Sequence, residues 1–418
     1  MKRQMRWIKL TLFSNIKTIK SISYGLLARS IEILVPIVLA PLFISEFGLG
    51  QYAAFAYFST SSIFFSTFIH FGLEARNLGI ARSDSEHDNL RNLFHQTFWV
   101  QNRLVILSAL LFVVFVNFTT PVGQEWYLAL NFFAGSVFVG LFPSWILAIK
   151  EQIFVYFKIV LFSRLFYFLA AIASLVFNWS LVFISFLFLI SSLLSLGMAY
   201  LHLRRQKLLL FAPMLLSLKD TPSSLPYSIL PLANSCFILI ANVIIQLNTS
   251  QFTMAIYLLT LQIMIATLSF GQTITFSIFS FAVKTTRKLI IASLIVLSFG
   301  TFFGLILLIF KYSVSYFLLS ASDKDFITNL TVLAIAVPFL FVANNWIQIF
   351  FVGARRRRYL LTPLPVYAIS VSFLFIFRDE SELTNNPFGI FLTLRLFQVL
   401  MIFLISMRNY RHIKFDRV

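Results

Sequence analysis

The chain is a series of apolar runs, each about 20 residues long, that are separated by short polar gaps. A helix needs roughly 20 mostly apolar residues to cross the hydrocarbon core of a bilayer. Hydrophobic residues make up 59% of the chain and charged residues only 11%, which is too little polarity for the surface of a soluble domain. Helices satisfy their backbone groups within one segment, so they are favoured over strands in lipid. We therefore predict an all-α polytopic membrane protein with about twelve transmembrane helices, over residues 21–45, 52–71, 97–118, 126–148, 159–177, 181–201, 227–247, 252–281, 289–310, 327–352, 360–377 and 388–407.

The Lys and Arg residues fall almost entirely into alternate gaps between these spans. Four arginines lie inside spans. The gaps that follow the odd-numbered spans hold only Lys311, Lys324 and Arg378. Because positive residues stay on the cytoplasmic side, we expect a multi-pass protein with both termini in the cytoplasm. The net charge of +18 is spread along this membrane edge, which favours membrane lipids and not nucleic acid as the partner.

Six predicted spans precede a basic gap at 203–224, and six follow it. The gap begins with Arg204, Arg205 and Lys207 and has an apolar face, so we expect it to lie along the cytoplasmic interface. Two bundles of six helices around a central cavity are a common plan for secondary transporters. We predict an amino-terminal six-helix lobe at 1–202, an interfacial linker at 203–224 and a carboxyl-terminal six-helix lobe at 225–418.

Motifs for catalysis are missing from the sequence. It has no Gly-x-x-x-x-Gly-Lys-Ser/Thr loop to hold a nucleotide phosphate, and its five histidines and Cys236 lack metal-ligand spacing. The predicted outer gaps are short, the longest at 311–326, so no extramembrane domain is expected to hold a substrate. The prediction is a protein that is not an enzyme and that needs no metal and no cofactor.

Two charged residues, Arg29 and Glu32, lie inside the first span, where each costs about 2.5–3.5 kcal/mol. The helical rise puts Arg29 roughly 12 Å and Glu32 roughly 16 Å from the cytoplasmic end, and their spacing puts them on one face. One interpretation is an anion-binding arginine beside a titratable carboxylate in a water-filled cavity. The other is an i,i+3 ion pair that only neutralises both charges. Glu32 is the candidate for ion coupling, because it is the one acid predicted within the membrane.

Three further arginines, Arg103, Arg164 and Arg395, lie near the ends of their spans. Each is close enough to an interface for its side chain to reach the head groups. If they face inward instead, they form a cationic path with Arg29, and that path suits a phosphate or pyrophosphate.

The second half of the chain offers amides in place of charges. Such side chains suit hydroxyl-rich ligands such as sugars in a hydrated cavity, or they form hydrogen bonds between helices. The substrate-binding candidates are Asn242, Gln246, Gln262 and Asn344.

Several short motifs stand near the ends of the first spans. They are Arg29, Pro41-Leu42-Phe43, Phe47-Gly48-Leu49-Gly50-Gln51-Tyr52, Phe71-Gly72-Leu73-Glu74-Ala75-Arg76-Asn77, and Pro143-Ser144-Trp145 followed by Ala148 and Glu151. Through these motifs, residues 21–165 resemble Wzx-type O-antigen and polysaccharide flippases of the multidrug/oligosaccharidyl-lipid/polysaccharide (MOP) exporter superfamily. Beyond residue 165 the likeness rests on span count and lobe plan.

The resemblance implies a V-shaped protein that rocks between inward-open and outward-open states around a central cationic cavity. The implied cargo is an undecaprenyl-pyrophosphate-linked oligosaccharide, carried from the cytoplasmic to the outer leaflet of a bacterial inner membrane during lipopolysaccharide biosynthesis. It also implies a basic residue at the position of Arg29 and coupling to a cation gradient. A glycan polymerase and a chain-length regulator are further partners that this interpretation allows.

Two alternative functions stay open. A MATE-like drug/cation antiporter of the same superfamily is expected to have acids in its cavity, whereas the spans here hold mostly arginines. A membrane-embedded glycan polymerase shares the hydropathy profile, but it is expected to have a long external loop.

Overall fold

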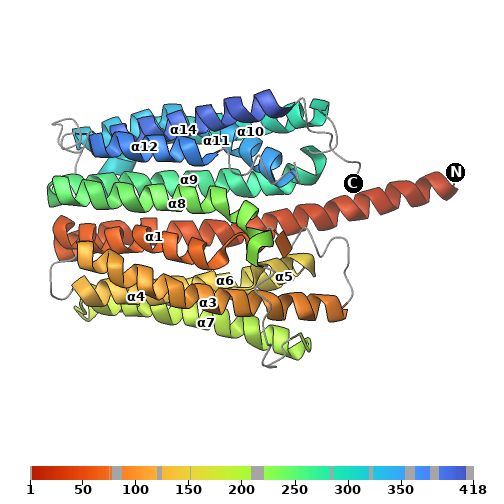
Figure 1. Ribbon diagram of the computed structural model, residues 1–418, viewed down its shortest axis with the longest axis horizontal. Helices are drawn as coiled ribbons and strands as arrows, with labels where there is room; N and C mark the ends of the chain where they lie inside the picture. The colour runs from red at the N-terminus through yellow and green to blue at the C-terminus, as the bar shows by residue number, and fades with distance from the viewer. Residues whose placement is uncertain are drawn as a thin grey trace.

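The computed structural model is a bundle of long helices (Figure 1). It describes residues 2–74, 76–77, 87–119, 125–150, 152–208, 221–282, 286–319, 323–353, 363–376 and 386–410, and these contain no strand. The all-α class is thus confirmed. In chain order the helices are α1 (Lys2–His70), α3 (His87–Thr119), α4 (Glu125–Gly140), α5 (Ser144–Ile149), α6 (Ile153–Val176), α7 (Leu181–Arg205), α8 (Thr221–Asn248), α9 (Gln251–Ala282), α10 (Thr286–Leu319), α11 (Lys324–Gly353), α12 (Pro363–Ile376) and α14 (Pro387–Tyr410).

Helix α1 is a hairpin of two helical arms. Gly48 has φ 79° and ψ 162°, a conformation that a glycine adopts readily because it has no Cβ. Phe43 and Phe55 are twelve residues apart, roughly 18 Å along a straight helix. Their ring centroids are nevertheless only 5.2 Å apart, so the chain reverses between them. We call residues 2–47 the first arm and residues 49–70 the second arm of α1.

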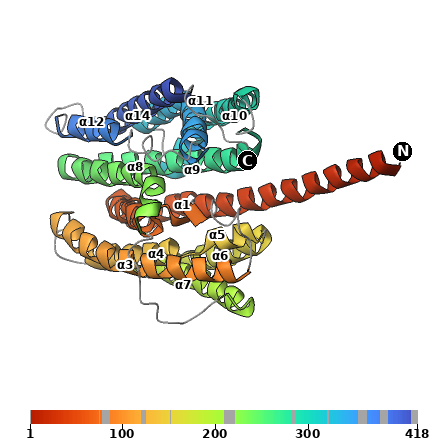
Figure 2. The same cartoon turned by 45° about the vertical axis from the view of Figure 1, so that its right-hand side comes forward.

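The two arms of α1 lie between the remaining helices (Figures 1 and 2). On one side α1 packs against α4 and α6, and α7 packs on both of these. On the other side it packs against α8 and α9, which contact α12 and α11 respectively. The helices up to α7 therefore meet those from α8 onward mainly along α1. The predicted limits of the two lobes and of the linker at 203–224 stay predictions, and residues 209–220 lie outside the described ranges.

The number of apolar helices agrees with about twelve membrane crossings. Ten helices in the described ranges are long and apolar enough to span a bilayer, and α12 is a shorter apolar helix. One of the ten, Ser30–His70, contains the turn at Gly48, so it supplies both of the first two predicted spans.

The predicted span at 126–148 agrees with a candidate membrane span at Glu125–Leu147, which is broken between α4 and α5, where Pro143 has no N–H to continue the helical ladder. One predicted boundary is wrong. The outer gap at 311–326 is mostly helix, since α10 continues to Leu319 and α11 begins at Lys324. Lys311 suggested a helix end, but its Nζ donates to Thr331 Oγ1 on α11 at 3.1 Å, so this charge is accommodated within a helix pair.

Candidate functional site

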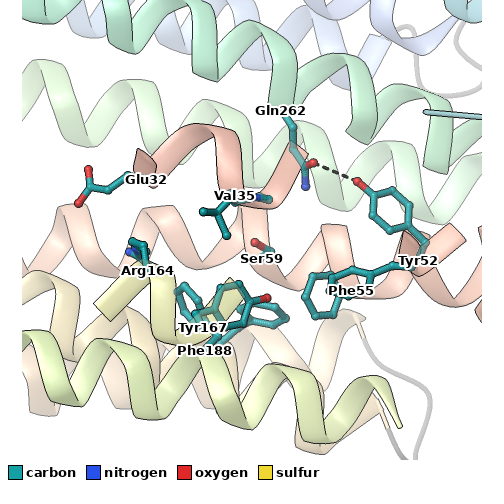
Figure 3. A pocket seen from close by; sticks show the side chains of 12 residues that line it. Glu32, Val35, Tyr52, Phe55, Ser59, Arg164, Tyr167, Phe188 and Gln262 are labelled. Carbon is teal, nitrogen blue, oxygen red and sulfur yellow. Dashed lines mark hydrogen bonds between the residues drawn. The ribbon is translucent and has the colours of Figure 1, made fainter. Parts of the chain in front are cut away.

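A cavity of about 80 Å³ lies within the bundle, between the two arms of α1 and helices α4, α6, α7 and α9 (Figure 3). Half of its lining residues are aromatic, and several carry polar groups. The lining residues are Glu32, Val35, Pro36, Phe43, Tyr52, Phe55, Ser59, Phe132, Arg164, Tyr167, Phe188 and Gln262. The structure thus brings three of the predicted site residues, Glu32, Arg164 and Gln262, to one cavity.

Glu32 and Arg164 lie at the same end of this cavity (Figure 3). Glu32 comes from the first arm of α1, and Arg164 comes from α6. The Arg164 guanidinium carbon is 5.4 Å from the centroid of the Phe188 ring, which holds the cation against an aromatic face. Among the described residues Arg164 forms no ion pair, and it lines the same cavity as Glu32.

The helical register explains why Glu32 faces the cavity. Val35 and Pro36 are three and four residues after Glu32, so all three lie on one side of the first arm. Pro36 has no N–H to donate to the backbone carbonyl of Glu32, four residues earlier. The backbone next to the carboxylate is therefore less constrained than in an uninterrupted helix.

At the other end of the cavity, Tyr52 connects α1 to α9. Tyr52 is 1% exposed, and its hydroxyl donates to Gln262 Oε1 at 3.0 Å (Figure 3). Among the described residues that line the cavity, Gln262 is the one that comes from the helices after α7. The hydrogen bond therefore joins the two parts of the chain at the cavity itself.

The cavity in this state has room for only a few water molecules. Pockets for drug-sized ligands are about 300–1,000 Å³. One carboxylate, one guanidinium and several hydroxyl and amide groups inside aromatic walls can exchange a proton or hold a small ion. They can hold a larger molecule only after the helices on either side of the cavity separate.

Arg103 and Arg395 are not among the described residues that line this cavity. Arg103 is exposed on α3, on the same surface as the exposed Ile106, Leu107 and Leu110, which suits a lipid-facing side. Arg395 is buried in α14, so it does not reach for the interface. The backbone of Arg29 and Asn344 lies in α1 and α11, but their side chains are outside the described part of the structure.

Asn242 is the centre of a buried hydrogen-bond network between α8, α9 and the second arm of α1. Its Nδ2 donates to Thr60 Oγ1 at 3.0 Å and to Ser61 Oγ at 3.3 Å, and its Oδ1 accepts from the Tyr257 hydroxyl at 3.0 Å. Asn242 therefore connects helices here and does not face the cavity. One turn further along α8, Gln246 Oε1 is buried and has no hydrogen-bond partner in the described ranges.

Sequence reasoning missed the hydroxyl groups on the cavity, which come from Tyr52, Ser59 and Tyr167. Tyr52 is the last residue of the motif that contains Gly48, but a tyrosine in an apolar run is usually interpreted as a lipid-facing or core residue. Glu32 is the one acid among the lining residues, and no group of three or more His, Cys, Asp or Glu occurs in the described residues. The cavity thus lacks the donor set of a typical protein metal site.

Comparison with solved structures places the fold among MATE transporters of the MOP superfamily. An inward-facing multidrug resistance MATE family transporter of that superfamily aligns with a TM-score of 0.66 and 16% identity, over 95% of this chain and 96% of that one. A eukaryotic MATE transporter aligns with a TM-score of 0.64 and 11% identity, over 94% and 96%. A MOP superfamily transporter from Pyrococcus furiosus, described as having a binding pocket of reverse polarity, gives 0.54 and 14%, over 95% of each chain.

No protein-family model and no curated protein sequence matches the chain. The helical transporter-like fold that was expected from the sequence agrees with these structures. At identities of 11 to 16% the likeness shows the fold, and the cargo has to be argued from the residues of this chain.

Proposed function

We propose that this protein is a membrane transporter that carries a lipid-linked anionic glycan by alternating access. The proposed cargo is an undecaprenyl-pyrophosphate-linked oligosaccharide, such as an O-antigen repeat unit, moved from the cytoplasmic to the outer leaflet of a bacterial inner membrane. The observation that carries the proposal is the position of Arg164, whose guanidinium faces a cavity inside the bundle with no carboxylate bound to it among the described residues. The MATE-like fold supports the transporter class.

Arg164 supplies what a diphosphate needs in an apolar environment. A guanidinium can give two parallel hydrogen bonds to phosphate oxygens, and these bonds are stronger than those between neutral groups. Carrying a charged head group through bare hydrocarbon is prohibitively costly, because each unpaired ion loses its hydration. A hydrated path past Arg164 lowers that cost while the polyprenyl tail stays in the lipid.

Glu32 gives the transporter a means of releasing its cargo. When Glu32 is protonated, Arg164 has no acidic neighbour on the cavity and is available to phosphate. When Glu32 ionises, its carboxylate competes with the phosphate for the guanidinium. A proton gradient can therefore bias the direction of transport through this one carboxylate.

The small cavity means that cargo enters only when the helices after α7 move away from α1. That movement separates Tyr52 from Gln262 and Asn242 from Thr60 and Ser61. The amides of Asn242, Gln246, Gln262 and, on α11, Asn344 then become available to sugar hydroxyls. In this structure the first three are held inside the bundle.

A drug/cation antiporter is the second candidate, and two observations favour it. The structural neighbours include multidrug resistance transporters. The cavity also combines one carboxylate with several aromatic rings, a combination that attracts organic cations. In this function the Glu32 carboxylate binds the cation, and the positive charge of Arg164 repels it.

A deletion strain of the source organism tests the two candidates. For a flippase, lipid-linked repeat units accumulate on the cytoplasmic leaflet, and wild type restores transport whereas Arg164→Gln does not. Arg103→Gln is the matched control, because this arginine is exposed on α3 and should restore transport fully.

Two other outcomes contradict the proposal. Sensitivity to cationic dyes with normal surface glycan indicates the antiporter. Single repeat units that reach the surface but never polymerise indicate a polymerase.

A further inference from the structure

Arg395 is a buried cation that the proposed transport cycle does not use. It stands eight residues after the first residue of α14, roughly 12 Å along the helix, and it is 6% exposed. An arginine keeps its proton in proteins, so the charge must be balanced where it is. Arg395 is not among the residues that line the Glu32–Arg164 cavity.

The hydrogen-bond partners of Arg395 among the described residues are neutral. Its Nη1 donates to the Tyr367 hydroxyl of α12 at 3.0 Å and to Gln398 Oε1 of α14 at 3.0 Å. Within the described part of the chain, no carboxylate forms an ion pair with this guanidinium. A buried charge without a counter-charge is strongly destabilising. The Arg395 guanidinium therefore requires a negatively charged partner that these residues do not supply.

The same two residues carry hydrogen-bond donors that point to no acceptor. Gln398 is fully buried, its Oε1 is committed to Arg395, and its Nε2 has no partner among the described residues. Exchanging Oε1 and Nε2 of Gln398 does not satisfy the amide either, because the NH₂ group would then face the guanidinium, which is also a donor. The Tyr367 hydroxyl accepts from Arg395, and no described residue accepts its hydrogen. Three neighbouring side chains therefore offer N–H or O–H groups, and none of them supplies a negative charge.

We propose that Arg395, Tyr367 and Gln398 bind a small inorganic anion, with chloride as the expected ligand. The anion accepts from the Arg395 guanidinium, the Tyr367 hydroxyl and Gln398 Nε2, and it neutralises the buried cation. This site belongs to the helices after α7 and is separate from the cavity, so it does not depend on the identity of the cargo.

The surroundings favour a halide over a phosphate or a lipid head group. The Phe237 ring lies 6.4 Å from the Tyr367 ring and 5.3 Å from the Phe391 ring, and Phe391 is one turn before Arg395 in α14. These apolar walls strengthen the attraction for a compact anion, because little water screens it. The two phenylalanine rings offer no acceptors to a protonated phosphate.

Thermal unfolding of the purified full-length protein tests the site. Chloride is titrated against gluconate at constant ionic strength, with bromide and inorganic phosphate as further probes. We expect chloride and bromide to raise Tm saturably and phosphate to have no saturable effect. The proposal is overturned if chloride has no saturable effect on wild type, or if phosphate alone has one.

Three variants locate the effect. Arg395→Gln should abolish the chloride-dependent rise in Tm, and the exposed Arg103→Gln should keep it. Tyr367→Phe removes one donor and should raise the half-saturating chloride concentration about tenfold, because a hydrogen bond to a charged group is lost. If Arg395→Gln does not fold, Tyr367→Phe decides alone. An unchanged chloride response in Tyr367→Phe, or in a folded Arg395→Gln, contradicts the assignment.

Discussion

Arg164 and Arg395 both lack a bound carboxylate among the described residues, but their surroundings differ. Arg164 lines a cavity that it shares with Glu32, and its guanidinium lies over the Phe188 ring. Arg395 is packed among neutral donors and aromatic rings, with its Nη1 bound to Tyr367 and Gln398. The first charge shares its cavity with an acid, whereas the second is bonded only to neutral groups in the described part of the chain.

The difference separates two uses of charge inside a membrane. A cation that faces a cavity beside a titratable acid can gain and lose a ligand, because the acid replaces the ligand when it leaves. A cation surrounded by hydrogen-bond donors has no other group to balance its charge when its anion leaves. An anion bound there therefore stabilises the folded protein. Transport should therefore depend on Arg164, and stability should depend on Arg395.

The largest expected effect is the loss of transport on substitution of Arg164. Arg164→Gln should lower the initial rate of lipid-linked oligosaccharide transport in proteoliposomes about 10- to 100-fold, because it removes charge-assisted hydrogen bonds to the diphosphate. If Glu32 acts only through Arg164, the double variant Glu32→Gln/Arg164→Gln should be no slower than Arg164→Gln alone. Glu32→Gln alone should also remove the dependence of the rate on pH.

Two results contradict this distinction between the arginines. Additive losses in the double variant mean that the two residues act separately. A loss of transport in Arg103→Gln as large as that in Arg164→Gln means that charge anywhere in the spans matters, and not the charge at the cavity.

The sequence predicted the helical class and about twelve membrane spans, because span-length apolar runs and charged gaps leave few other structures open. It also placed Glu32 and Arg164 among the site residues, since charges inside a span are too costly to be incidental. It could not say that Arg103 is exposed and Arg395 buried. Both lie near span ends, and the neighbouring helices decide which way each side chain turns. The continuation of α10 past Lys311 was missed for the same reason, because its partner Thr331 is twenty residues away.

A smaller effect is expected at Asn242, which provides a neutral contrast to Arg395. Asn242 is fully buried with both ends of its amide bonded, so Asn242→Leu leaves the Tyr257 hydroxyl without its acceptor. We expect the variant to lose about 2 kcal/mol of stability in a denaturant or thermal assay. Because no charge is involved, the loss should be equal with and without chloride. A chloride-dependent loss indicates instead that the anion effect is general to the protein and not specific to Arg395.

The smallest effect is expected for Tyr52→Phe, and it tests whether the cavity contains water. Tyr52 and Asn242 each make hydrogen bonds between α1 and the helices after α7, but only the Tyr52–Gln262 bond lies on the cavity. Removing the Tyr52 hydroxyl costs about 1–3 kcal/mol if Gln262 Oε1 is left without a donor, whereas a water molecule that replaces the lost hydroxyl reduces the cost. Tyr52→Phe should therefore cost under about 1 kcal/mol in the same assay. A loss as large as that of Asn242→Leu means that the cavity is dry, and a dry cavity cannot support proton exchange at Glu32.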